Sequence, residues 1–516
     1  MTRKKQEPGG IKALAVFMIC LLVFGTCGWA LYAKLTEQTS PLNVLTGTLG
    51  GSITIGTTSS PDSLDIRTQS GNAVTQALLG NVYESLLSRD QNNKPQAGIA
   101  DSWKVSDDGL RYTFTINNGK TFSNGDALNA NDVVWSLQQT IERKYQGADR
   151  LTNLASVTNN GNNTVIITLR SPNPDLAWAL SGRAGIVYDK DARYSYSTEA
   201  VGSGPFVVDE WDKDASLVLK ANARYWGQRA KTGTITLQYY RDDAAAVSAF
   251  GKGEVDAVTP IAATQKSALQ KASDADNVQI VQGTSTQKLV LGFNNGADSI
   301  LSDKRYRQGM RYAIDREALM NALGGGQTLG GPLTSLEPGY EDLTGMYPHN
   351  DDKATELLSY FFYVSKRRTL TFVYPQRYGS QVGELLKQQV YPMNVDLDVK
   401  MVDDATWQKT VVQQKQYDFT LFDMSDSHDL ATLMDGDNYI GYDSPEAQTL
   451  WKKTQASDSD SAYESNMKAL ARQISTDSPV DWLGVRQPIT AYRNTITGMP
   501  KNMTDQLLPL RDVQVR

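Results

Sequence analysis

Side chains that could act as nucleophiles or general bases are scarce in this sequence. Its 516 residues contain two histidines, His349 and His428, and two cysteines, Cys20 and Cys27. Both cysteines lie in an apolar N-terminal segment, and neither histidine belongs to a recognisable motif. Ser-His-Asp and Cys-His arrangements therefore have few possible members. We expect no catalytic residue and no cofactor in this chain.

Carboxylates that follow an expected strand are the more informative polar groups. Residues 369–374, 395–402 and 417–424 favour strands, and helical patterns separate them, which is typical of a parallel sheet covered by helices. Ligands of such sheets lie beyond the carboxyl ends of the strands. That position is occupied here by three carboxylates, those of Asp423, Asp426 and Asp429.

None of the acidic clusters predicts a metal site. Each lacks the Gly at the sixth position and the Glu at the twelfth that an EF-hand calcium loop requires. Two histidines also make nickel binding by imidazoles unattractive. We therefore interpret these clusters as solvated loops and expect no metal.

The first half of the chain favours strands. Its short runs of β-branched and aromatic residues lie at 52–56, 111–116, 164–169, 216–221 and 234–240. Together with the alternating second half, they predict an α/β fold. The length of the chain calls for two or three domains.

An uncharged apolar segment of about 21 residues, 13–33, follows the basic residues of 1–12. Those cations predict that 1–12 stays in the cytoplasm, and 34–50 is polar enough for a linker. The segment is either an uncleaved membrane anchor, which its length favours, or a signal peptide cleaved after Ala30 or Ala33. In both cases the remaining chain lies on the extracellular face of the cell membrane.

The charge balance excludes one class of partner. A formal net charge of −6 offers no basic stripe that could neutralise a run of phosphates. Nucleic acid is therefore not expected as a partner.

Several long motifs carry a family resemblance. Residues 202–227 contain G-S-G-P-F, two strand-like runs and N-A-R-Y-W-G. This block resembles the G-T-G-P-[YF] and N-x-x-Y-W-G motifs of the extracellular solute-binding proteins of ABC importers, in the cluster with dipeptide-, oligopeptide- and nickel-binding members. Segments 82–90, 97–137 and 293–319 also resemble blocks of that family, so the likeness extends over about 51–516.

The resemblance implies a bilobal clamp of the periplasmic-binding-protein type, with two hinge strands and a larger lobe of two subdomains. We expect lobe 1 at 51–290 with an inserted subdomain at about 75–200, lobe 2 at 291–485, and a return to lobe 1 at 486–516. The two crossings are expected near 286–295 and 481–493. A ligand enclosed between the lobes needs a partner for each buried polar group.

The resemblance also suggests ligand-binding residues. Residues 420–427 are similar to the W-x-x-D-Y-x-D-P stretch whose carboxylate takes the α-ammonium of a bound peptide, although Trp, Tyr and Pro are absent here. Asp423 is the matching candidate. The further candidates are Tyr378, which follows the run at 369–374, Asn438 and Tyr439, which lie in D-N-Y-I-G-Y, and Trp482, which lies on the returning crossing.

The resulting hypothesis is a monomeric substrate-binding component that captures a peptide and presents it, unchanged, to an ABC permease in the membrane. The alternative ligand is an oligosaccharide or another small solute, for which aromatic platforms would replace a charged anchor. Two rivals of other classes are an extracellular hydrolase and a membrane-tethered ligand sensor. Both lack an evident motif, since histidine is scarce and the basic N-terminus offers no signalling domain.

Overall fold

A computed structural model describes residues 50–516, apart from 273–276, 363–366, 425–426 and 506. The predicted anchor or signal at 13–33 lies outside the described residues. Within the described part of the chain, no helix combines the length and apolar character needed to span a membrane.

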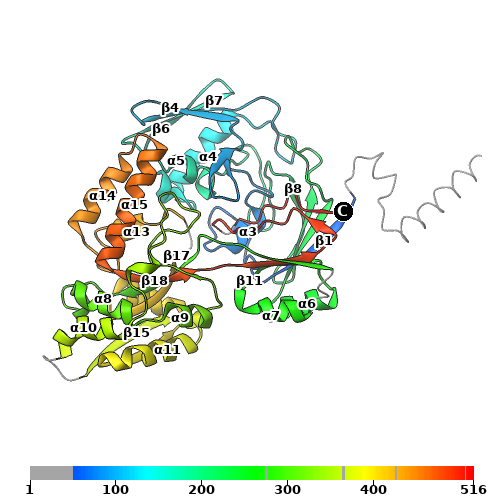
Figure 1. The fold of residues 1–516 in the computed structure, drawn as a ribbon. Coiled ribbons are helices and arrows are strands. Elements are labelled where there is room, and N and C mark those ends of the chain that lie inside the picture. Colours follow the sequence, from blue (N-terminus) through cyan, green and yellow to red (C-terminus); the bar gives the residue numbers. More distant parts are fainter. Residues whose placement is uncertain (1–49, 273–276, 363–366, 425–426, 506) are drawn as a thin grey trace, which may run out of the picture.

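The first lobe is built on a seven-stranded sheet with the order β12-β19-β11-β1-β10-β9-β8 (Figure 1). This sheet joins segments that are far apart in the sequence, because β19, from near the C-terminus, lies between β12 and β11. Its strands are β1 (Ser52–Thr57), β8 (Phe206–Asp212), β9 (Ser216–Ala221), β10 (Thr234–Tyr239), β11 (Ala257–Ile261), β12 (Val278–Gln282) and β19 (Ile489–Arg493). Its helices are α3 (Ala73–Leu78), α6 (Asp243–Lys252) and α7 (Lys266–Ala272).

A smaller four-stranded sheet with the order β4-β5-β7-β6 completes this lobe. Its strands are β4 (Ser102–Val105), β5 (Arg111–Thr115), β6 (Leu154–Asn160) and β7 (Thr164–Leu169). The accompanying elements are α4 (Ala130–Glu142), α5 (Leu176–Ala179) and the hairpin of β2 (Leu87–Arg89) and β3 (Pro95–Ala97). Helix α4 begins with a capping box. The side chain of Asn129 accepts a hydrogen bond from a backbone N–H of the first turn, and the side chain of Asp132 accepts one from the backbone N–H of Asn129.

The second lobe is a six-stranded sheet with the order β14-β18-β13-β17-β15-β16. The strands are β13 (Lys288–Phe293), β14 (Gln327–Thr328), β15 (Arg368–Pro375), β16 (Val395–Val402), β17 (Phe419–Met424) and β18 (Val480–Val485). Strand β15 pairs in parallel with both β16 and β17. The parallel arrangement that the alternating sequence predicts is therefore confirmed for these three strands, whereas β13 pairs antiparallel with β17 and β18.

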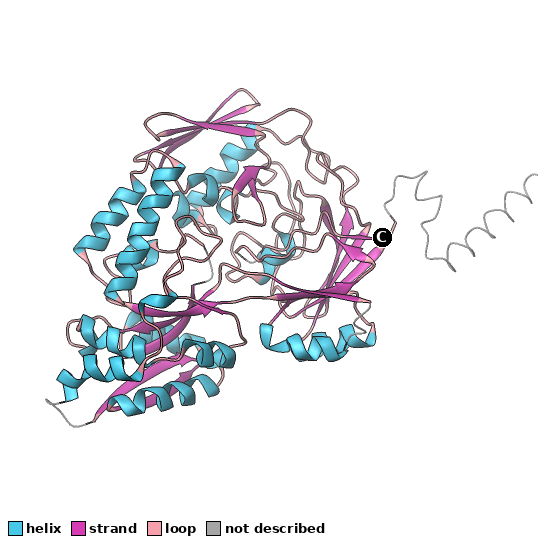
Figure 2. Ribbon diagram, in the orientation of Figure 1, coloured by secondary structure: helices cyan, strands magenta, loops and turns pink. Residues whose placement is uncertain are grey.

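Helices cover both faces of this second sheet, and Figure 2 shows how helix-rich this lobe is beside the strands and long loops of the first. One face packs against α8 (Lys304–Ala313), α9 (Arg316–Ala322), α10 (Asp351–Phe362) and α11 (Gln381–Val390). The opposite face packs against α13 (Ala431–Met434), α14 (Pro445–Gln455) and α15 (Asp460–Asp477). The short elements α12 (Asp404–Trp407), β20 (Ile496–Thr497) and β21 (Gln514–Val515) complete the fold.

The chain passes between the two lobes twice. Residues 283–287 join β12 to β13, and residues 486–488 join β18 back to β19. The two connections touch each other, because Arg486 donates its backbone N–H to Gln287 O at 3.0 Å and Ser285 Oγ donates to Arg486 O at 2.8 Å. Two short adjacent connections of this kind permit hinge motion of one lobe against the other.

The motif at 202–227 is structural. The carboxylate of Glu84 accepts hydrogen bonds from Tyr225 Oη (2.7 Å), Ser203 Oγ (2.8 Å) and Trp226 Nε1 (3.1 Å). Burial raises the pKa of Glu84 even though these donors and Lys120 lower it. The aromatic pair that ends the motif thus fixes a buried carboxyl of the segment 82–90.

Close backbone packing explains the two glycines of the same motif. A Cβ on Gly202 would lie 2.0 Å from Val82 O, and one on Gly204 would lie 2.4 Å from Asn81 O. No side chain fits at either position unless the backbone moves, so glycine is required there.

Candidate functional site

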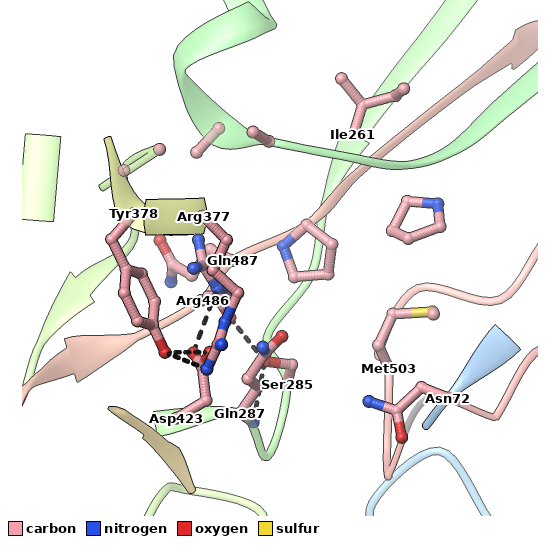
Figure 3. Close-up of a pocket in the computed structure, with 16 residues that line it drawn as sticks. Asn72, Ile261, Ser285, Gln287, Arg377, Tyr378, Asp423, Arg486, Gln487 and Met503 are labelled. Atoms are coloured by element: carbon pink, nitrogen blue, oxygen red, sulfur yellow. Dashed lines mark hydrogen bonds and ion pairs between the residues drawn. The ribbon is translucent and has the colours of Figure 1, made fainter. Parts of the chain in front are cut away.

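A cavity of about 580 Å³ lies where the two lobes and both connections meet (Figure 3). Figure 3 shows Asn72 and Met503 across the cavity from the group around Asp423. The first lobe lines it with Asn72, Pro260, Ile261, Ala262, Ala263 and Met503, and the second lobe with Gly324, Gly325, Arg377, Tyr378 and Asp423. The connections contribute Ser285, Gln287, Arg486, Gln487 and Pro488.

The carboxylate of Asp423 is the central polar group of this cavity. Its Oδ2 accepts a 2.6 Å hydrogen bond from the hydroxyl of Tyr378. Its Oδ1 is buried, and among the described residues no donor forms a hydrogen bond to it. The nearest cation, Nε of Arg486, lies 3.8 Å from Oδ1. The site therefore presents one carboxylate oxygen with unused capacity to accept a hydrogen bond.

Local strand geometry turns Asp423 toward Tyr378. Side chains alternate along β17, so Phe419, Leu421 and Asp423 share one face of the sheet. Phe419 and Leu421 pack in the core under α8–α11, and Asp423 continues that row beyond the core. Tyr378 belongs to the turn that follows β15, the parallel neighbour of β17. The carboxyl ends of two parallel strands thus place both residues together.

Tyr378 is held as a neutral donor. Burial and the neighbouring charge of Asp423 raise the pKa of Tyr378, so its phenol keeps the proton that it donates to the carboxylate. Arg377 donates from Nη2 to the same hydroxyl oxygen at 3.1 Å and forms an ion pair with Asp404 outside the cavity.

Two glycines allow the lobes to approach each other at the edge of the cavity. Gly324 and Gly325 have positive φ angles of 102° and 80°. Gly324 O accepts a hydrogen bond from Thr264 N of the first lobe at 3.2 Å, and a Cβ on Gly325 would lie 3.0 Å from Cβ of Ala263. The Gly-rich stretch 324–331 therefore contributes a close contact between the lobes.

Asn438 and Tyr439 line a second cavity, of about 350 Å³, which Asp423 also borders. Phe422 and Met424 also line it, and they lie on the opposite face of β17 from the side chain of Asp423. The Asn438 amide is already used, since Nδ2 donates to Tyr442 O at 2.9 Å and Oδ1 accepts from Tyr442 N at 3.0 Å. Asn438 thus holds a turn together through both atoms of its amide.

Trp482 lies in the core of the second lobe. Its exposure is 0%, and it packs on the face of the sheet that α13–α15 cover. It lines neither of the two cavities. Trp482 therefore fills the core of the second lobe, because β18 is buried on both faces.

Sequence reasoning missed the two arginines of the larger cavity. Arg377 precedes a candidate that was recognised, and Arg486 lies within the expected crossing at 481–493. The signal was available, because a residue on a connection between two lobes borders the cleft that they enclose.

A metal site has no support in the described residues, which contain no group of three or more His, Cys, Asp or Glu side chains suited to an ion.

The sequence profile of the bacterial extracellular solute-binding proteins, family 5, matches residues 94–456. The chain is a family 5 solute-binding protein. Oligopeptide-binding protein AppA of Bacillus subtilis is 22% identical over 541 aligned positions, which cover 97% of this chain and 96% of AppA. The family assignment makes this chain a binding protein and not an enzyme.

Solved structures of other binding proteins share the fold. The substrate-binding protein CtaP of Listeria monocytogenes superposes with a TM-score of 0.79 at 20% identity, covering 90% of this chain and 99% of CtaP. AppA of Bacillus subtilis, solved in complex with a nonapeptide, gives a TM-score of 0.74 at 20% identity and covers 91% and 99%. The bilobal clamp expected from the sequence is therefore confirmed.

Proposed function

We propose that this family 5 protein captures a peptide in the cavity at Asp423 and delivers it unchanged to an ABC permease. The observation that carries the proposal is the buried Oδ1 of Asp423, which lacks a hydrogen-bond donor among the described residues. A buried acceptor without a donor costs free energy, and a peptide α-ammonium supplies both a donor and the opposite charge.

The same cavity offers partners for the rest of a peptide. Arg377 and Arg486 can receive a carboxylate, and Ser285, Gln287 and Gln487 can bind amide groups. Among its described lining residues, Tyr378 is the one aromatic side chain, and its hydroxyl is engaged by Asp423. An oligosaccharide site would use aromatic platforms, so the lining favours a peptide.

The location of the protein follows from the family and from its N-terminus. Family 5 proteins are extracellular solute-binding proteins. We propose that 13–33 either anchors the chain in the membrane or directs its export, and that 34–50 links it to the folded lobes. The folded lobes would then lie on the extracellular face of the membrane, next to the permease. We propose that the protein acts there as a monomer.

Native mass spectrometry of the full-length protein, purified in detergent, tests this function. We expect peptide to co-purify with the wild-type protein and to be lost from the Asp423→Asn variant, because an amide is a poorer acceptor for an ammonium. The matched control is Asp437→Asn, since the carboxylate of Asp437 is 98% exposed. Recovery of a sugar, or of equal peptide on both variants, would contradict the proposal.

A further inference from the structure

A short segment of the second lobe, Ser427 to Asp429, is inserted into the first lobe. It follows β17, the strand that carries Asp423, and all three of its side chains are buried. Ser427 N donates to Asp505 Oδ1 at 2.8 Å, Asn93 Nδ2 donates to Ser427 Oγ at 2.9 Å, and Arg150 Nη1 donates to His428 O at 2.9 Å. Every one of these partners belongs to the first lobe.

The side chain of His428 makes the most specific of these contacts. Its ring stacks on Trp178, with centroids 4.4 Å apart and planes inclined by 17°. Its Nδ1 lies 2.8 Å from Oδ1 of Asp175, which also accepts a hydrogen bond from the hydroxyl of Tyr463. The pKa of Asp175 is lowered overall. Burial acts to raise it, but this effect is smaller than the combined effect of His428 and the hydrogen bonds to the carboxylate, so Asp175 is ionised.

Within its own lobe the segment is firmly held. His428 N donates to Glu337 Oε1 at 3.0 Å, and Asp429 pairs with Nζ of Lys288 at 3.1 Å. Lys288 also pairs with Glu337 at 3.2 Å, and in β13 it lies opposite Met424, the last residue of β17. If one lobe moves against the other, either the contacts of His428 with the first lobe break or the end of β17 is distorted.

The backbone of His428 has an unusual conformation. Its φ angle is +59°, in the left-handed region that non-glycine residues seldom adopt. Such strain persists where surrounding contacts hold it, and it is concentrated at functional sites. Here it directs the imidazole out of the second lobe and onto Trp178.

We propose that His428 is a positioning residue: it binds Asp175 and Trp178 of the first lobe and so ties the segment 427–429, which follows the strand that carries Asp423, to that lobe, and lobe closure and ligand capture are thereby coupled. The part of this inference that concerns ligand capture rests on the proposed function of the site at Asp423, whereas the part that concerns lobe closure does not. Closure through His428 is testable without a ligand.

The test measures the distance between the lobes by fluorescence energy transfer. Dyes are placed on the full-length protein at Lys213→Cys and Lys387→Cys, both exposed and on different lobes, after Cys20→Ser and Cys27→Ser. The variants are His428→Asn, chosen because Asn tolerates the left-handed backbone, and Asp175→Ala in the other lobe. The matched control is His349→Asn, the other histidine, which also pairs with an aspartate, Asp351, but within one lobe.

We expect His428→Asn and Asp175→Ala each to shift the ligand-free protein toward a longer interlobe distance and to weaken trialanine binding about tenfold. The effect of the double variant should be clearly smaller than the sum of the two single effects, because the two residues share the contact between Nδ1 of His428 and Oδ1 of Asp175. His349→Asn should leave distance and affinity unchanged.

An unchanged distance in a folded His428→Asn or Asp175→Ala protein would overturn the proposal, as would fully additive effects. If His428→Asn fails to fold, Asp175→Ala decides alone, since it leaves the 427–429 segment intact. A failure of the peptide proposal would give a different result. Neither the wild type nor any variant would bind trialanine, but the interlobe distance would still increase in His428→Asn and Asp175→Ala.

Discussion

Tyr378 and Asp423, 45 residues apart in the chain, are joined by a 2.6 Å hydrogen bond at the boundary between two lobes. The bond engages one carboxylate oxygen of a residue that lines the cavity, and it leaves the other oxygen buried without a hydrogen-bond donor among the described residues. Two parallel strands, β15 and β17, create this pairing by ending side by side.

Removing the Tyr378 hydroxyl should weaken ligand binding without unfolding the protein. In Tyr378→Phe the ring still fills its place, but Asp423 loses the donor that orients it. We expect trialanine to bind about 10-fold more weakly, as the loss of a hydrogen bond to a charged group implies. Isothermal titration calorimetry checks this, and an unchanged dissociation constant would exclude an orienting role for the hydroxyl.

Gly202→Ala should destabilise the first lobe severely. The added Cβ would lie 2.0 Å from Val82 O, and backbone atoms cannot move aside cheaply. We expect a loss of about 3 kcal/mol in the free energy of unfolding, measured by urea denaturation. The control is Gly345→Ala, where no atom lies within 4 Å of the new Cβ. Equal stability of the two variants would refute the packing argument.

The pH dependence of stability should contain a contribution from Glu84. Burial raises its pKa in the folded protein above the ordinary value of about 4.5. Between those two values the folded state holds a proton that the unfolded state releases, so stability falls as pH rises through this window. The slope should be smaller in Glu84→Gln and unchanged in the exposed control Glu464→Gln. Identical slopes in all three proteins would show that Glu84 titrates normally.

Lys288→Met should unfold the end of the second lobe that carries the 427–429 segment. Lys288 is completely buried between Glu337 and Asp429, and without it two carboxylates remain buried together. Breaking such a pair costs about 3–5 kcal/mol. Lys468→Met, whose partner Glu341 is near the surface, should cost less than about 1 kcal/mol. Chemical denaturation of both variants measures the difference.

Local patterns predicted the elements well because strand and cap signals are local. The runs at 164–169 and 216–221 coincide with β7 and β9, and the run at 234–240 contains β10. Asp423 and Tyr378 lie together for a related reason, since residues at the ends of neighbouring parallel strands share one edge of the sheet.

The remaining site candidates depended on information that spacing does not contain. Trp482 lies on a strand that is buried on both faces, and periodicity alone does not separate such a strand from one that borders a cleft. Asn438 is occupied by backbone groups of its own turn. The His428 latch joins residues more than 250 positions apart, and sequence spacing gives no sign of that contact.

The most direct test of ligand capture at Asp423 compares trialanine with N-acetyl-trialanine by isothermal titration calorimetry on the full-length protein. Acetylation removes the ammonium and changes little else. We predict that acetylation weakens binding to the wild type by about 10- to 100-fold, and that Asp423→Asn binds both forms equally weakly. Equal affinity of the wild-type protein for both peptides would contradict the account.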